Sequence, residues 1–232
     1  MNMTKEKLPT FGYGTNGDEF KPLAEVLLSD VRQTYWVKIR ADGSTHGLQL
    51  EDFHQQMSDL NLNPDVPEDV CTGFDTARNL YLYSWFAYRF QTVAELQACA
   101  TLELALGKRI ESECTKKVKN LGPRLLFAFE KGWLKSDQIR VYQRSSENRK
   151  RHTSLFDEVL QQDNELQTST PAWEEEKHAA EYLEKLIEAI PSLRNVVAHG
   201  NPMLHGGSVT VLEICCDLIN QLFPQKIESQ GK

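Results

Sequence analysis

Three polar residues near the C-terminal end of the chain have side chains suited to chemistry. They lie in the stretch 191–202, PSLRNVVAHGNP, as Arg194, Asn195 and His199. The planar guanidinium of an arginine matches a phosphate with two parallel hydrogen bonds and keeps its charge. A histidine titrates near neutral pH and can transfer a proton, and an asparagine can orient the imidazole or hold a 2′-hydroxyl. These groups suffice to cut RNA without a metal ion: one removes the 2′-hydroxyl proton, and a cation stabilises the pentavalent phosphorane.

The same three residues also have a purely structural interpretation. Arg194 would cap the last carbonyl groups of a helix, and His199 would bond to the backbone. An amphipathic helix is predicted over 174–190, and Pro191 is expected to break or kink it because proline lacks a backbone donor. A break at that point would swing Arg194 away from the core and toward His199.

Apolar residues recur with helical spacing along most of the chain, which predicts an all-α fold with antiparallel bundle packing. The expected helices cover 21–36, 50–62, 124–133, 174–190 and a last segment that ends before Pro224. Ser208 or Thr210 is expected to cap this last helix, with Thr210 and Glu213 at capping-box spacing. Residues 68–118 form either one very long helix or two helices joined near 90–92.

Other stretches are less regular. Residues 81–90 are apolar around nearly the whole helix circumference and are expected at the centre of the core. The stretch 35–50 is either a short hairpin around 41–44 or a helix end followed by a loop. Residues 136–172 mix charged and polar types and are expected to form a mobile connection with a short helix over 154–162.

Glu103 places a carboxylate on an otherwise apolar helix face, because it shares a helical phase with Cys99, Leu106 and Ile110. A buried carboxylate is costly unless it is paired. One hypothesis is that Glu103 meets Arg194 or His199 across the bundle. The alternative is that rotation of the helix takes the carboxylate to solvent.

The residues around the polar triplet resemble a known superfamily. The segment LRNVVAHG, with the helix before it and TVLEICCDLINQLF after it, resembles the C-terminal half of a HEPN domain. That superfamily carries an arginine and a histidine separated by four to six residues, with a polar residue commonly just after the arginine. Four residues separate Arg194 from His199, and Asn195 is the polar residue. The stretch ARNLYLYSWFAYRFQTVAELQACATLELALGKRI is also similar to the long helices of bacterial HEPN proteins.

The resemblance implies a HEPN-like bundle with long central helices over 63–224, after an N-terminal extension over 1–62 and before a disordered tail over 225–232. It also implies a metal-independent endoribonuclease, a toxin or antiphage effector, that leaves 2′,3′-cyclic phosphate and 5′-hydroxyl ends. Arg194, Asn195 and His199 would be catalytic, supported by Glu103. A homodimer and an antitoxin or regulatory partner are expected, with tRNA or mRNA as substrate. Other HEPN domains have lost this chemistry and bind a nucleotide, RNA or a protein, so a non-catalytic module is the alternative.

Charge and composition restrict these expectations. The net charge of −7 argues against a broad basic surface, although a local basic cleft remains compatible with it. Two basic groups are candidates to follow an RNA backbone: Arg140, Arg144, Arg149, Lys150 and Arg151 in one, and Lys108 and Arg109 in the other. The five cysteines form no Cys-x-x-Cys pair, which favours reduced thiols in a cytoplasmic protein. No metal, cofactor or membrane-spanning segment is expected.

Overall fold

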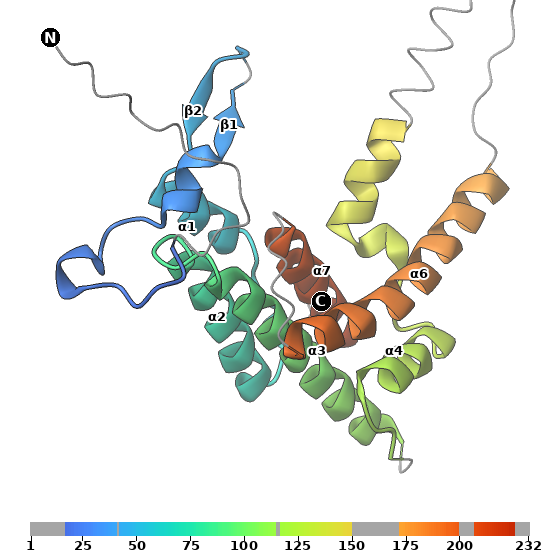
Figure 1. Cartoon of the computed structure of the whole chain (residues 1–232). Helices are drawn as coiled ribbons and strands as arrows, with labels where there is room; N and C mark the ends of the chain where they lie inside the picture. Colours follow the sequence, from blue (N-terminus) through green and yellow to red (C-terminus); the bar gives the residue numbers. More distant parts are fainter. Residues whose placement is uncertain (1–16, 41, 115–116, 150–171, 200–206, 226–232) are drawn as a thin grey trace, which may run out of the picture.

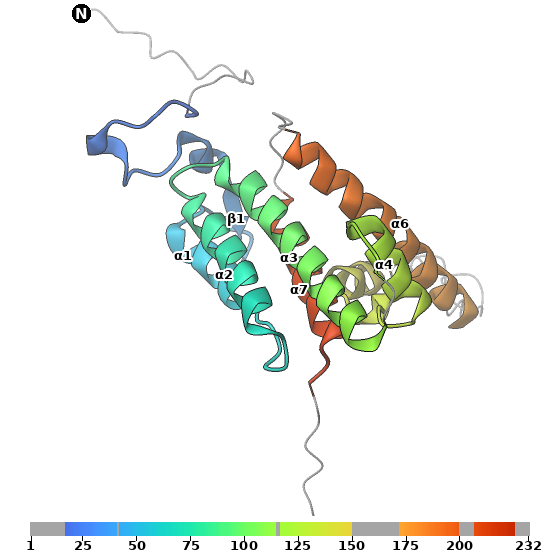
Figure 2. The same cartoon turned by 90° about the horizontal axis from the view of Figure 1, so that it is seen from below.

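The computed structural model describes residues 17–40, 42–114, 117–149, 172–199 and 207–225, and these residues are mostly helical. The central helix is α3 (Phe90–Glu113), which packs against α2 (Glu68–Tyr83), α4 (Leu121–Glu130), α6 (Ala172–Ala198) and α7 (Ser208–Leu222). Helix α1 (Leu50–Ser58) packs on α2 at the other side of the molecule from α4 and α6 (Figures 1 and 2). The mainly helical class predicted from the sequence is confirmed.

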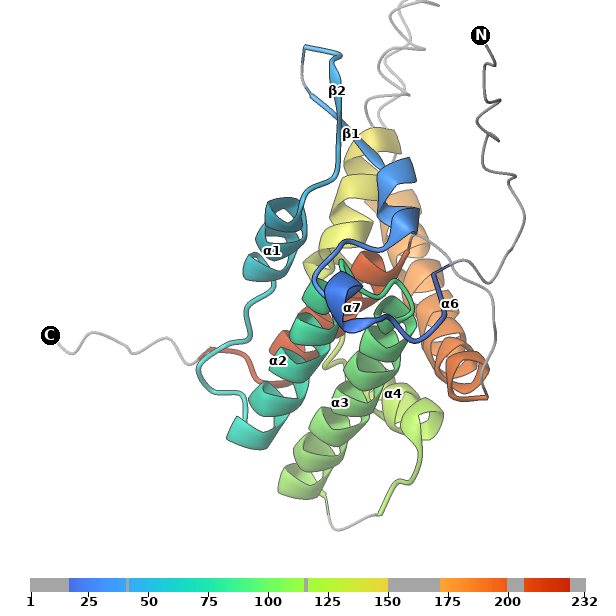
Figure 3. The same ribbon diagram turned by 60° about the vertical axis from the view of Figure 1, so that its left-hand side comes forward.

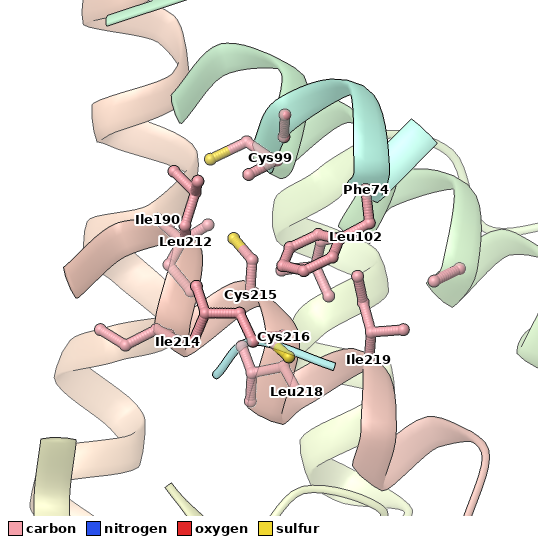
Figure 4. Packing of buried hydrophobic residues seen from close by; sticks show 14 of the residues in the cluster. Phe74, Cys99, Leu102, Ile190, Leu212, Ile214, Cys215, Cys216, Leu218 and Ile219 are labelled. Atoms are coloured by element: carbon pink, nitrogen blue, oxygen red, sulfur yellow. The ribbon is translucent and has the colours of Figure 1, made fainter. Parts of the chain in front are cut away.

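The core forms where α2, α3, α6 and α7 meet. Figure 4 shows Phe74 of α2, Leu102 of α3, Ile190 of α6 and several residues of α7 converging there. Helix α7 is buried along almost its whole length, from Leu212 to Leu222. A helix buried on nearly all sides belongs in the centre of a domain, and α7 packs chiefly against α3 and also against α2.

The long apolar region 68–118 forms two helices, which settles the alternative left open by the sequence. The chain turns at 84–89, where the buried Ser84 hydroxyl donates to the carbonyl of Tyr81. The expectation that 81–90 lies at the centre of the core is therefore wrong in part. Tyr81 and Tyr88 are buried, whereas Tyr83 and Phe90 are exposed because the turn lies at one end of the helix pair.

The helix predicted over 21–36 is wrong. The chain forms two short 3₁₀ turns, η1 (Leu23–Glu25) and η2 (Val31–Tyr35), with the buried Asp30 between them. The Asp30 carboxylate accepts hydrogen bonds from its neighbour Arg32 and from the distant Tyr88 N–H. This side chain offers the backbone an alternative to helical bonding and fixes the break.

The next stretch is a hairpin, one of the two alternatives considered for 35–50. Strand β1 (Val37–Ile39) pairs antiparallel with β2 (Thr45–Gly47), with Lys38 opposite His46. Figure 3 shows the hairpin projecting beyond α1, away from the helices. The predicted short helix after it is confirmed as α1, whose Phe53 and Met57 are buried.

Residues 136–149 do not form the mobile connection that was predicted there. They form η3 (Ser136–Gln138) and a helical segment over 140–149, and Ile139 is fully buried. The Tyr142 ring lies 5.0 Å from that of Tyr182 on α6. The short helix expected over 154–162 lies outside the described residues.

The last two helices correct two further expectations. Helix α6 runs through Pro191 instead of breaking there. The pyrrolidine ring packs close to Gly122 of α4, and the preceding Ile190 is buried, so tertiary contacts hold both sides of the proline in place. Helix α7 begins without a side-chain cap from Ser208 or Thr210. Among the described residues, no helix is long and apolar enough to cross a bilayer.

Candidate functional site

Arg194 and Asn195 lie in the last two turns of α6, beside a pocket between three helices. The pocket has a volume of about 410 Å³. Its walls are residues of α3, α6 and the start of α4, namely Glu103, Asn120, Leu121, Gly122, Pro123, Pro191, Arg194 and Asn195. Since α6 continues through Pro191, the proline forms part of the pocket wall and does not redirect Arg194.

Arg194 is the cationic side chain of this pocket, and the carboxylate of Glu103 is its counter-ion. An Arg194 Nη lies 3.8 Å from a carboxylate oxygen of Glu103, and the other Nη donates to the Asn195 side-chain oxygen at 3.3 Å. The side chains of Arg194 and Glu103 are 40% and 24% exposed. The sequence-based hypothesis that Glu103 meets Arg194 across the bundle therefore agrees with the observed geometry, but the pair lies near solvent and not deep in the core.

The wall contributed by α4 is held in place by a residue that the sequence did not single out for this site. The Arg124 guanidinium donates to the backbone carbonyls of Glu103 at 2.7 Å and Val118 at 2.9 Å. It lies over Gly107 of α3, where a Cβ atom would come within 2.9 Å of it. Arg124 thus ties α3 and the segment before α4 together.

The entry into α4 adds polar backbone groups to the pocket. Asn120 adopts a positive φ of 67°, which a residue other than glycine rarely does, and it leads directly into Leu121 and Gly122. The first amide groups of a helix have no acceptor within the helix. The pocket therefore combines a guanidinium, a carboxylate, the Asn195 amide and the beginning of a helix.

His199 lies outside this pocket in the single chain. It follows α6 directly, its N–H donates to the Asn195 carbonyl at 3.0 Å, and its side chain is exposed. At about 100° per residue, Asn195 and His199 lie on one helical face, while Arg194 lies roughly 140° from His199. The structure brings Arg194, Asn195 and Glu103 together and leaves His199 one turn beyond Asn195.

The first basic group is engaged by acidic residues of α7. Arg144 binds both carboxylate oxygens of Glu213 at 2.6 Å. Arg140 binds Asp217 through its side chain at 2.7 and 2.8 Å and through its backbone N–H at 2.9 Å. The hydrogen bonds that Arg144 donates to Glu213 raise the pKa of Arg144. Burial lowers the pKa of Arg140, but Asp217 more than offsets this effect and raises it overall.

The remaining basic candidates also have structural partners. Lys108 lies 2.8 Å from Asp69, and Arg109 lies 2.6 Å from Glu113 and stacks over the Trp133 ring. Arg149 lies over the Tyr142 ring. Lys150 and Arg151 fall outside the described residues. Binding of RNA by these groups stays a prediction, and each described member already contributes to packing.

All five cysteines are free thiols, and Cys99, Cys215 and Cys216 are buried. The hydrogen bond with the neighbouring Cys99 thiol, together with burial, raises the pKa of Cys215. In the described part of the chain, no three His, Cys, Asp or Glu side chains converge as a metal site would require. Comparison with protein-family models, with curated proteins and with solved structures finds no match for this chain.

Proposed function

We propose that this chain is a metal-independent endoribonuclease of HEPN type, a toxin or antiphage effector. The observation that carries the proposal is the pairing of Arg194 with Asn195 at an open pocket, with the exposed His199 one turn further along. Arg194 binds the scissile phosphate, Asn195 orients the imidazole or the 2′-hydroxyl, and His199 transfers the proton.

The reaction follows from these roles. His199 accepts the proton of the 2′-hydroxyl, the 2′-oxygen forms a bond to phosphorus, and the bond to the 5′-oxygen breaks as that oxygen takes up a proton. The products carry a 2′,3′-cyclic phosphate and a 5′-hydroxyl. Arg194 stabilises the charge on the pentavalent phosphorane, and the phosphate displaces Glu103 from the guanidinium.

A homodimer completes the site in this proposal. His199 is exposed and lies outside the pocket of its own chain. The resemblance to HEPN proteins implies that two motifs face one cleft, so that an imidazole of either copy approaches the phosphate. An antitoxin or regulatory partner would then act by covering this cleft or by separating the two copies.

The test is cleavage of total tRNA and mRNA in excess EDTA, followed by end-group determination. Wild type is expected to cleave, His199→Ala to be inactive, and Arg194→Lys to lose about 10- to 1000-fold in rate at nearly unchanged melting temperature. Lys185→Ala, on the exposed face of α6, is the matched control and should remain active. A folded, fully active Arg194→Lys variant, or activity lost in EDTA and restored by Mg²⁺, contradicts the proposal.

The second candidate is a non-catalytic module that binds a nucleotide. It is favoured by the position of His199 outside the pocket and by the pairing of Arg194 with Glu103. The pocket volume of about 410 Å³ lies in the range of small-molecule sites. Titration calorimetry with nucleoside monophosphates distinguishes the two: binding that Arg194→Ala abolishes, without RNA cleavage by wild type, supports the module.

A further inference from the structure

A second pocket lies between the first half of α6 and the segment 134–147. It has a volume of about 570 Å³, within the range of small-molecule sites, and we call it the Tyr142 pocket. Figure 1 shows the helical segment 140–149, in yellow, beside α6, in orange, and the contact between the Tyr142 and Tyr182 rings joins them. Among the described residues, none lines both this pocket and the pocket beside Arg194. The proposed catalytic function therefore leaves the Tyr142 pocket unassigned.

Two hydroxyl groups in the lining of the Tyr142 pocket have no hydrogen-bond partner in the described part of the chain. They belong to Ser136 and Tyr142, which are only 6% and 7% exposed. Buried hydroxyl groups are normally hydrogen-bonded, because burial without a partner costs free energy. Since both side chains line the pocket, a ligand bound there would supply the missing partners.

Three carboxylates line the same pocket, and each comes from a different element. Asp137 belongs to η3, Glu147 to the segment 140–149 and Glu176 to α6. None of the three forms an ion pair with a described residue. With Lys135 as the single cation of the described lining, the side chains of the pocket carry a net charge of −2 at neutral pH. Repulsion between the unpaired carboxylates favours a cationic ligand.

The placement of the charges indicates the shape of this cation. In the described part of the chain, no three His, Cys, Asp or Glu side chains converge as a metal ion would require, so the three carboxylates do not meet at one point. Leu134, Ala179 and Leu183 add apolar surface to the lining. A chain of methylene groups with ammonium groups at intervals matches both features. The methylene groups cover apolar surface, and each ammonium group reaches a separate carboxylate.

We propose that the Tyr142 pocket binds a linear aliphatic polyamine. Its ammonium groups pair with Asp137, Glu147 and Glu176, and one of them donates to the hydroxyl oxygens of Ser136 and Tyr142. Ammonium groups donate hydrogen bonds and never accept them, which matches a pocket of carboxylates and free hydroxyl groups. The proposal is independent of the ribonuclease activity, because the two pockets share no described lining residue.

Isothermal titration calorimetry of the full chain with spermidine tests the proposal. The titration is made at about 0.15 M salt, where attraction between distant exposed charges is largely screened. Hexaamminecobalt(III) is the control ligand, because it carries the same charge and N–H donors on a compact ion without methylene groups. Spermidine is expected to bind one site per chain, and more tightly than hexaamminecobalt(III).

Variants of the lining identify the site. Tyr142→Phe keeps the ring, removes the hydroxyl, and should weaken spermidine binding by about 5- to 10-fold. Glu147→Gln and Glu176→Gln should each weaken it by about 2- to 5-fold, as for other exposed ion pairs. Glu188→Gln, at an exposed position of α6 outside the lining, is the matched control and should bind spermidine as wild type does. The melting temperature should remain as in wild type, because the substituted carboxylates are exposed and the Tyr142 ring is retained.

Four results would overturn the proposal. Wild type that does not bind spermidine is the first, and equal affinity for hexaamminecobalt(III), which would indicate an unspecific acidic surface, is the second. The third is binding that Tyr142→Phe leaves unchanged, or that Glu188→Gln weakens as much as Glu147→Gln does, because the ligand would then lie elsewhere. The fourth is a tetralysine peptide that binds where spermidine does not, which would assign the pocket to a basic protein segment.

Discussion

Replacement of Glu103 by glutamine measures the contribution of the ion pair between Glu103 and Arg194 to stability. The charges lie 3.8 Å apart. The Coulomb energy at that distance is about 1 kcal/mol in a water-like medium and about 4 kcal/mol at an effective dielectric constant of 20. With the two side chains 40% and 24% exposed, solvent screening brings the value close to the lower limit. Glu103→Gln should therefore lower the free energy of unfolding by less than about 1 kcal/mol, as for other exposed pairs.

The same change should strengthen anion binding at Arg194. Glutamine keeps the size of the side chain and removes the negative charge that competes with a phosphate for the guanidinium. If the pair contributes up to about 1 kcal/mol, the affinity for a short RNA that cannot be cleaved should rise by up to roughly 5-fold. Urea denaturation gives the stability, and fluorescence anisotropy of labelled RNA gives the affinity.

Salt and a control variant complete the experiment. The stability difference between Glu103→Gln and wild type should shrink at high ionic strength, because salt screens exposed charges. Glu111→Gln, at an exposed position on the same helix, controls for the loss of one negative charge from the chain. A stability loss above about 2 kcal/mol that persists at high salt would show that Glu103 acts as a buried partner, and would refute this reasoning.

Three further substitutions test the structure. Gly107→Ala should lower the free energy of unfolding despite a helix-propensity gain of about 1 kcal/mol, because its Cβ would lie 2.9 Å from the Arg124 guanidinium. In an Arg124→Ala background this loss of stability should disappear. An equal loss of stability in both backgrounds would exclude Arg124 as its cause. Ser208→Ala should lower the free energy of unfolding by about 1 to 3 kcal/mol, because it removes a hydroxyl donor from the fully buried Glu95; a change under about 0.5 kcal/mol in urea denaturation would contradict this. Burial raises the pKa of Asp30, but hydrogen bonds from Arg32 and from the Tyr88 N–H lower it overall. Its stabilising contribution should thus be complete above the unfolded pKa of about 3.9 and be lost as the pH falls through the lower folded value, so that wild type loses more stability than Asp30→Asn between about pH 5 and pH 2; equal losses would contradict this.

Helical periodicity predicted the helices of the core because apolar residues at that spacing had a neighbouring helix to pack against. It failed at 21–36, where the spacing is equally helical but the buried Asp30 carboxylate breaks the segment. Periodicity also failed to predict the ordered structure of 136–149, because the composition of this stretch is mixed and polar. Its order comes from one fully buried residue, Ile139, and from the ion pairs of Arg140 and Arg144 with α7.

The sequence predicted the candidate site only where one side chain contacts another side chain. The helical phase of Glu103 indicated that its carboxylate needs a partner, and Arg194 provides it. Arg124 holds the same pocket through backbone carbonyls, and such acceptors leave no pattern in a sequence. The positive φ of Asn120 and the packing of Pro191 beside Gly122 likewise depend on three-dimensional neighbours that local sequence does not specify.

The position of α7 has a consequence for biosynthesis. This helix is the most completely buried, and it follows all the other described helices in chain order. Asn63, at the beginning of the bundle, bonds with Asn220 near the end of α7, a separation of 157 residues. Domains begin to fold as the ribosome extends the chain. Until α7 emerges, Cys99, Leu102 and Leu106 of α3 lack the helix that covers them, so this face of the core stays exposed while the residues between α3 and α7 are synthesised.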